Sequence, residues 1–149
     1  MQEQFITQEK VERFLSKCIQ WTNEAAVGSL INGLHPRLDS YDIATNSAIT
    51  SYPTSEWGKN PNGVIHGGII ASMLDTAMGS LTSCVAGKNT PTISLQISYL
   101  CPVPLGDRFV ARAHITKCGN TVIYTIAEAW MESRPDTLVA TAQGIYHDG

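Results

Sequence analysis

Residues 60–87 carry a single formal charge, the carboxylate of Asp75. A glycine pair at positions 67 and 68 opens a long run of apolar and small residues around it. An element that is apolar or small on all sides is typical of a buried helix, and we predict one over residues 67–85. Burying a carboxylate without a partner costs several kcal/mol in practice, roughly. A carboxylate that is buried despite this cost usually has a role in catalysis or binding.

The expected helix has two unlike sides. The apolar side consists of Ile69, Ile70, Met73, Ala77, Met78 and Leu81. The small or polar side consists of Gly68, Ala71, Ser72, Asp75, Gly79 and Thr82. Small side chains let a ligand or another backbone come close, so the second side is the one from which Asp75 is reached.

Length and composition favour one α+β domain over residues 1–149, with an N-terminal helical segment (1–34) and a core (35–149). Hydrophobic residues make up 43%, enough for a packed core, and charged residues only 15%, against a usual share of ~25%. This low charge density indicates that another subunit covers part of the surface. The net charge of −3 and the scattered Lys and Arg residues argue against a nucleic-acid partner.

The N-terminal residues are polar and acidic, without the basic and apolar regions of a signal peptide, so we expect a cytoplasmic protein. The apolar stretch 64–87 is long enough for a membrane span, but it contains Asp75, several glycines and hydroxyl side chains. A buried core helix, and no membrane partner, is therefore expected. The four cysteines and four histidines are widely spaced, which predicts reduced thiols, no metal site and no cofactor.

Apolar periodicity places the remaining elements. A first helix over 8–21 carries a stripe made of Val11, Phe14, Leu15, Cys18 and Ile19. Gly28 and Gly33 break the segment that follows. Two short strands are expected within 36–54, and a loop rich in Gly, Pro and Asn from Ser55 to Gly63.

After the buried helix the apolar period becomes two, as in a strand. Ile93, Leu95, Ile97 and Tyr99 alternate with Ser94, Gln96 and Ser98. Three more strands are expected at about 107–117, 120–132 and 137–147. Short links at 102–106, at Gly119-Asn120 (a two-residue hairpin turn) and at 134–136 make neighbouring strands antiparallel. The predicted architecture is one antiparallel sheet packed against one buried helix.

His66-Gly67-Gly68 lies where the buried helix begins. Backbone N–H groups in the first turn lack partners within the helix and lie at the positive end of its dipole. Glycines leave room for a substrate oxygen to approach these donors, so the segment can serve as an oxyanion hole. For a glycine pair alone, a plain turn into a helix, with His66 making a local hydrogen bond, is the more frequent explanation.

Asp75 is a candidate general base or nucleophile; the alternative is an Asp that bonds a nearby backbone group or faces a wet groove. It follows Gly67 by eight residues, a separation of ~12 Å along a helix. One carboxylate therefore does not act on a group bound at its own helix start. A second subunit that brings its Asp75 to the first subunit's glycines would satisfy the geometry.

Four other polar residues are weaker candidates. Asn60 and Asn62 could orient water or a carbonyl, although loop asparagines are more often turn formers. Thr92 and Ser94 begin a strand; their hydroxyls could order a catalytic group, although Thr is common in strands. No Gly-x-Ser-x-Gly elbow, phosphate loop or dinucleotide fingerprint is present.

The spacing Asn60-x₅-His66-Gly67-Gly68-x₆-Asp75, followed by a helix and four strands, resembles the hotdog-fold acyl-CoA thioesterases of the phenylacetate-pathway (PaaI-like) type. The resemblance covers about residues 35–147 and includes a strand that ends in Cys101-Pro102. It implies a curved antiparallel sheet wrapped around the long helix, in a homodimer or homotetramer with active sites at the subunit interface.

The resemblance also implies roles for individual residues in hydrolysis of acyl-CoA to free acid and CoA. Asp75 matches the catalytic carboxylate, Gly67 the backbone donor to the thioester oxygen, and Asn60 a residue that holds thioester or water. Thr92 falls where a relative has a serine whose hydroxyl assists the reaction, and His66 matches a positioning residue. Gly68 and Ser94 are expected to contact substrate. The chain departs from the family at Asn120, where Arg or Lys is common.

Two alternatives use the same scaffold. An acyl-thioester dehydratase would use a His and a carboxylate to release water from a 3-hydroxyacyl-CoA. A non-catalytic acyl-CoA-binding protein would keep affinity for the thioester without releasing thiol.

Overall fold

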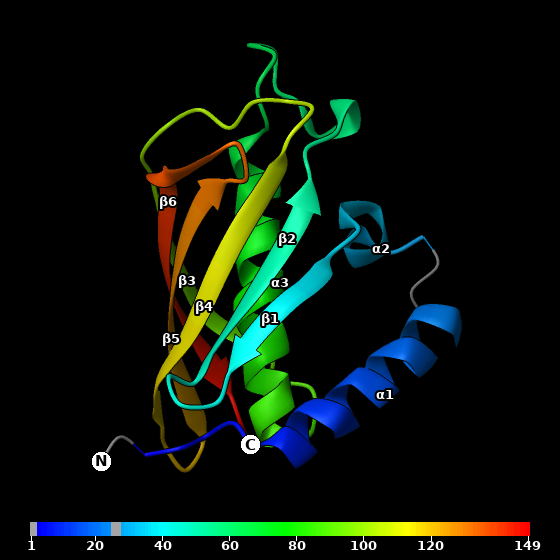
Figure 1. Cartoon of the computed structure of the whole chain (residues 1–149). Coiled ribbons are helices and arrows are strands. Elements are labelled where there is room, and N and C mark those ends of the chain that lie inside the picture. Colours follow the sequence, from blue (N-terminus) through cyan, green and yellow to red (C-terminus); the bar gives the residue numbers. More distant parts are fainter. Residues whose placement is uncertain (1–2, 25–27) are drawn as a thin grey trace.

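A long helix, α3 (Gly67–Ala86), lies along one face of a six-stranded antiparallel sheet in this computed structural model, which describes residues 3–24 and 28–149 (Figure 1). The other elements, in chain order, are α1 (Gln8–Glu24), α2 (Leu30–Leu34), β1 (Arg37–Asp42), β2 (Ser47–Pro53), the 3-10 helix η1 (Glu56–Gly58), β3 (Thr92–Tyr99), β4 (Arg108–Cys118), β5 (Val122–Met131) and β6 (Arg134–His147). The predicted arrangement of a sheet on one long helix is confirmed.

The strand order is β1-β2-β4-β5-β6-β3, so β3 lies at an edge of the sheet beside the last strand of the chain. Consecutive strands β3 and β4 are not neighbours; residues 100–107 carry the chain from one edge towards the middle of the sheet. This crossover places the residues that follow α3 next to the C-terminal residues, which are far away in the sequence.

The core lies between α3 and the central strands. Alternate residues of β4 (Phe109, Ala111, Ala113 and Ile115) are fully buried, as strand geometry requires of one face. The alanines leave room for the helix, whose Met73, Leu74 and Met78 belong to the same buried cluster as Tyr52 and Ile123. Each large apolar side chain buried here stabilises the fold by ~1.5–3 kcal/mol.

The α3 boundaries agree with the prediction, but burial on all sides does not. His66 is the N-cap, and Gly87 ends the helix in the left-handed conformation with φ of 73°. On the predicted small side, Gly68 is exposed, and Ala71 and Asp75 are only half-buried in the single chain. By length and composition α3 could also cross a membrane; its apolar side is accounted for here by packing against the sheet.

The N-terminal segment differs in detail from the predicted one. Helix α1 ends three residues later than expected, and of its apolar stripe Val11 is buried while Leu15 is 37% exposed. The side chain of Ile19 lies outside the described residues. Gly33 does not break the segment but lies inside α2, which ends before His35 at a φ of 50°.

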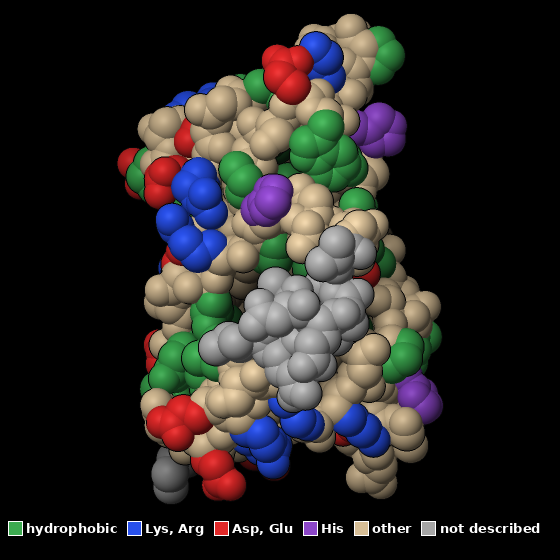
Figure 2. All heavy atoms as spheres, turned by 90° about the vertical axis from the view of Figure 1, so that its right-hand side faces the viewer, with side chains coloured by type: hydrophobic (Ala, Val, Ile, Leu, Met, Phe, Trp, Pro, Cys, Tyr) green, Lys and Arg blue, Asp and Glu red, His purple; other side chains and the backbone are tan. Residues whose placement is uncertain are grey.

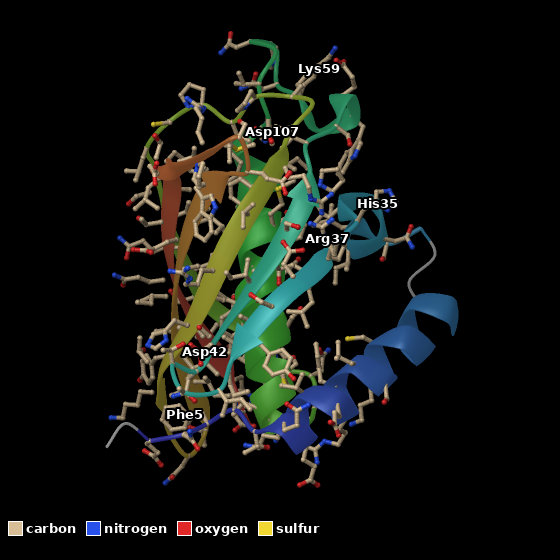
Figure 3. The ribbon with its side chains drawn as sticks, in the orientation of Figure 1. Phe5, His35, Arg37, Asp42, Lys59 and Asp107 are labelled. Atoms are coloured by element: carbon tan, nitrogen blue, oxygen red, sulfur yellow. The ribbon has the colours of Figure 1, made fainter. Side chains whose placement is uncertain are left out.

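Asn46 joins the N-terminal segment to the turn between β1 and β2. It is fully buried, its side-chain oxygen accepts the N–H groups of Phe5 and Ile6, and its amide donates to the carbonyl of Glu3. Phe5 lies at the end of the sheet opposite Lys59, which marks the loop that leads into α3 (Figure 3).

Two predicted hairpin links are shifted along the chain. The N–H of Gly119 donates to the carbonyl of Val122, so the central turn residues are 120 and 121, not Gly119-Asn120. The link before β6 is 132–133, because that strand already begins at Arg134. Residues of types that usually form turns, such as Gly119 and Pro135, therefore belong to or adjoin the paired strands here.

Candidate active site

Asp75 does not stand alone as predicted: it is half-buried and bonded to residues of two neighbouring strands. Its Oδ1 accepts a hydrogen bond from Thr92 Oγ1 at 2.8 Å and another from Tyr146 Oη at 2.9 Å. No protein donor to Oδ2 is present among the described residues. Hydrogen bonds from two hydroxyl groups lower the cost of keeping a carboxylate ionised inside a protein. The carboxylate thus has one bound oxygen and one available oxygen.

Two tyrosines flank Asp75 inside the fold. Burial, followed by the charge of Asp75, raises the pKa of Tyr146 well above its ordinary value of 10. The same two causes raise the pKa of Tyr52, whose hydroxyl donates to the carbonyl of Met73 at 2.7 Å. Both phenols therefore stay protonated in the folded protein at neutral pH and act as hydrogen-bond donors.

A β-bulge brings Thr92 to the carboxylate. Thr92 pairs with Tyr146 and Ser94 pairs with Ile145, so Ile93 is an extra residue in the edge strand. The extra residue places Thr92 on the face towards α3. A regular strand would place Thr92 on the same face as Ser94. Ser94 is exposed on the opposite face of the sheet from Asp75 of the same chain, and its contact with substrate stays a prediction.

The helix start has one backbone donor without a partner. The imidazole Nδ1 of His66 accepts the N–H of Gly68 at 2.8 Å, as an N-cap side chain does. Neither a backbone nor a side-chain acceptor binds the N–H of Gly67 among the described residues. His66 thus uses its ring to hold the turn, and Gly67 presents its N–H at the positive end of the helix dipole.

An apolar cavity of about 350 Å³ lies beside Gly67, lined among others by Ile65, Ile70, Leu100 and Val103. Tyr99, at the end of β3, lies against the helix start and donates its hydroxyl to the carbonyl of Gly67 at 2.8 Å. The cavity and the unpartnered N–H together form a small apolar site with one polar contact. Sequence analysis did not select Tyr99 or Tyr146, which lie in ordinary strand positions.

Asn60 forms the loop that leads into the helix. Its side-chain oxygen accepts the N–H groups of Asn62 at 2.9 Å and Val64 at 3.3 Å. These hydrogen bonds are the ones expected of an asparagine that forms a turn. No protein partner binds the side-chain NH₂ of Asn60 in the described structure, so this amide group can still donate to a ligand.

The predicted residues form two groups within one chain. Asp75 and Thr92 meet along the middle of α3, whereas Asn60, His66 and Gly67 meet at its N-terminal end. The eight residues between Gly67 and Asp75 correspond to ~12 Å of helix. One thioester carbonyl cannot touch both groups of the same chain.

Neither Asp75 nor the residues at the start of α3 line the second cavity of the described structure. A cavity of about 590 Å³ lies on strands β1, β2, β4 and β5 and is lined by Arg112, His114 and Glu128 among others. In the view of Figure 2, acidic and basic side chains lie close to one another on the described surface. The described residues include no group of three His, Cys, Asp or Glu side chains that could hold a metal ion.

Comparison with known proteins connects this geometry to one family. The model of the thioesterase superfamily matches residues 62–138. A protein of Caenorhabditis elegans is 34% identical over 118 residues, which cover 78% of this chain and 70% of that protein. Human acyl-coenzyme A thioesterase 13 is 29% identical over 83 residues, and the match covers 55% of this chain and 59% of the human protein.

A solved structure agrees with these matches. The phenylacetic acid degradation-related protein of Ralstonia eutropha superposes with a TM-score of 0.74 at 25% identity, over 87% of this chain and 97% of that one. The expected hotdog fold of PaaI-like proteins is therefore confirmed.

Proposed function

The chain belongs to the thioesterase superfamily, a family of thioester hydrolases, and we propose that it hydrolyses acyl-CoA to a free acid and CoA. The observation that carries this proposal is the Asp75 carboxylate, bonded through Oδ1 to Thr92 and Tyr146, with no donor to Oδ2 among the described residues. A carboxylate oxygen held in one orientation on the rim of a packed core is suited to react with a water molecule or a carbonyl carbon.

Two routes use this oxygen. In the first, Asp75 Oδ2 takes a proton from water as the water oxygen bonds to the thioester carbonyl carbon. The C–S bond then breaks, and the thiolate of CoA leaves and takes up the proton that Asp75 Oδ2 had received, which restores the carboxylate. In the second, Oδ2 itself bonds to the carbonyl carbon, the thiolate leaves, and water hydrolyses the resulting anhydride. Both routes pass through a tetrahedral oxyanion.

The N–H of Gly67 is the proposed donor to this oxyanion. It has no partner within the described chain, it lies at a helix N-terminus, and it borders the apolar cavity that would receive the acyl group. A single donor of this kind is typically worth ~10²–10³ in rate. The side-chain NH₂ of Asn60 and the ring of His66 lie on the same end of α3 and would orient the thioester.

The separation of Asp75 from Gly67 supports a site built from two copies of the chain. We propose a homodimer or homotetramer in which Asp75 of one copy faces the helix start of another. Strand β3 favours this arrangement because its edge is unpaired within the chain and Ile93, Tyr99 and Leu100 are each more than half exposed.

Asp75→Asn tests the proposal, because it keeps the shape of the side chain and removes its charge. We expect the rate of thiol release to fall by at least ~10². Asp136→Asn, which changes an exposed carboxylate on β6, is the matched control and should be unaffected. Near-normal thiol release by a folded Asp75→Asn protein would remove Asp75 from the mechanism.

The substrate panel should span acyl chain lengths, aryl groups and a 3-hydroxyacyl-CoA. A thioesterase releases free thiol from the 3-hydroxyacyl-CoA, whereas a dehydratase forms an enoyl product. A chain that binds acyl-CoA but releases thiol from no member of the panel would be a binding protein.

A further inference from the structure

The ring of Tyr146 occupies a slot that two glycines leave open. It lies on β6 and is 1% exposed. A methyl group at Gly144 would lie 2.7 Å from one edge of the ring, and a methyl group at Gly79 would lie 3.4 Å from the other edge. The strand glycine therefore cannot be replaced without moving the ring. The slot fixes the ring between the sheet and α3.

The hydroxyl at the end of this fixed ring contacts Asp75 twice. It is 2.9 Å from Oδ1 and 3.3 Å from the backbone carbonyl oxygen of the same residue. Thr92 Oγ1 reaches the same Oδ1 from the neighbouring strand. Two donors on one oxygen limit rotation of the carboxylate about its Cβ–Cγ bond, and they leave Oδ2 free to react.

We propose that Tyr146 is a positioning residue of the active site, whose hydroxyl holds Asp75 Oδ1 so that Oδ2 faces the thioester. This inference rests on the proposed function and adds a residue outside the segment that the family model matches. Tyr146 does not touch substrate, because its ring is enclosed in the core. It also does not exchange its proton with the reaction, because burial and the charge of Asp75 raise its pKa.

Tyr146→Phe removes only the hydroxyl and keeps the ring in its slot. We expect kcat for the best acyl-CoA of the panel to fall ~10-fold, as for loss of a hydrogen bond to a charged group. KM should stay within about twofold, because no substrate contact is lost. A merely structural role would lower the amount of folded protein without this separation of kcat from KM.

Combination with Asp75→Asn separates the possible outcomes. If Tyr146 acts through Asp75, adding Tyr146→Phe to Asp75→Asn causes no further loss of thiol release. If Asp75→Asn is inactive but Tyr146→Phe has normal kcat, the positioning role is wrong and the proposed function stands. If Asp75→Asn releases thiol at a near-normal rate, Asp75 is not part of the mechanism and the positioning role of Tyr146 is wrong as well. If the wild-type protein releases thiol from no acyl-CoA, the proposed function itself fails.

A second pair of variants keeps the idea testable if Tyr146→Phe does not fold. Thr92→Val removes the other donor to Oδ1 with little change in shape, and Thr92→Ser keeps it. We expect lower kcat at constant KM for Thr92→Val, and recovery of most of the wild-type kcat for Thr92→Ser. Full activity of Thr92→Val would show that fixing Oδ1 is irrelevant to the reaction.

Discussion

The two ends of α3 differ in the contacts that the rest of the molecule makes with them. At the C-terminal end, Gly87 bonds back to the carbonyl of Ser83, and its own carbonyl accepts the ammonium group of Lys17 from α1. The guanidinium of Arg13 lies against the same glycine. Cations complement the negative end of a helix dipole, so this end is satisfied by the chain itself.

At the N-terminal end, the ring of His66 accepts the N–H of Gly68, but no charged side chain binds this end in the described chain. No acidic residue lies in its first turn, and the N–H of Gly67 is unbonded beside an apolar cavity. The contrast is that the chain binds the orphan carbonyl of Gly87 at one end of α3 but leaves the N–H of Gly67 without an acceptor at the other. Contacts within the chain stabilise the C-terminal end of α3, and the N-terminal end is the one that we propose binds the substrate.

The largest expected effect comes from removing the free donor. Gly67→Pro deletes the N–H at the first helical position, where proline fits a helix, and His66 already has an extended backbone with ψ of 137°. We expect kcat for acyl-CoA hydrolysis to fall by ~10² or more. Gly67→Ala is the control, because it adds the same close contact with Tyr99 but keeps the donor. Equal kcat values for the two variants would contradict the oxyanion role.

An effect of intermediate size is expected on the free energy of unfolding at high pH, because of the two tyrosines beside Asp75 in the middle of α3. Burial and the charge of Asp75 raise the pKa of Tyr52 and of Tyr146 above 10 in the folded state. Above that pH the unfolded chain loses these protons while the folded chain keeps them. The free energy of unfolding should therefore fall as pH rises past 10, by ~1.4 kcal/mol per pH unit for each tyrosine.

Urea unfolding between pH 8 and pH 11 measures this slope. Burial also raises the pKa of the Cys84 thiol to about 11, which adds a decline that begins near pH 9. Tyr52→Phe isolates one phenol and should reduce the slope above pH 10 by ~1.4 kcal/mol per unit. An unchanged slope in this variant would show that Tyr52 titrates normally.

The smallest effect is expected at the C-terminal end of α3, where the chain itself binds the carbonyl of Gly87. Lys17→Gln removes the ammonium group from the carbonyl of Gly87, and we expect the free energy of unfolding to fall by ~0.5 kcal/mol. The kcat for acyl-CoA should not change, because the site lies at the opposite end. Lys117→Gln, at an exposed position of β4, is the matched control. A kcat loss in Lys17→Gln alone would mean that the two ends are coupled.

Local patterns predicted much of the fold. The uncharged run and its glycines identify α3 and its two ends, because capping and periodicity act over a few residues. The turns of the hairpins were predicted less well, because Gly119 and Pro135 are typical of turns but are used here beside or within strands. Leu15 belongs to the apolar stripe of α1 by spacing, and only packing decides that it is exposed.

The candidate site was predicted in part for a related reason. Asp75, Gly67 and His66 lie in one segment, so their spacing is visible in the sequence. Tyr146 follows Asp75 by 71 residues, and it meets the carboxylate only because β6 pairs with the edge strand β3 instead of β3 pairing with β4. Such a crossover depends on the whole sheet and leaves no local signal.

The extra residue in β3 has a consequence for how chains of this fold diverge. Ile93 is the residue that rotates the strand so that position 92 faces the helix. Loss of one amino acid there would turn the threonine hydroxyl outward and leave Asp75 with a single donor, although every residue of the proposed site would still be present in the sequence. An alignment that matches Thr92 across a gap at this point would therefore pair residues with opposite orientations.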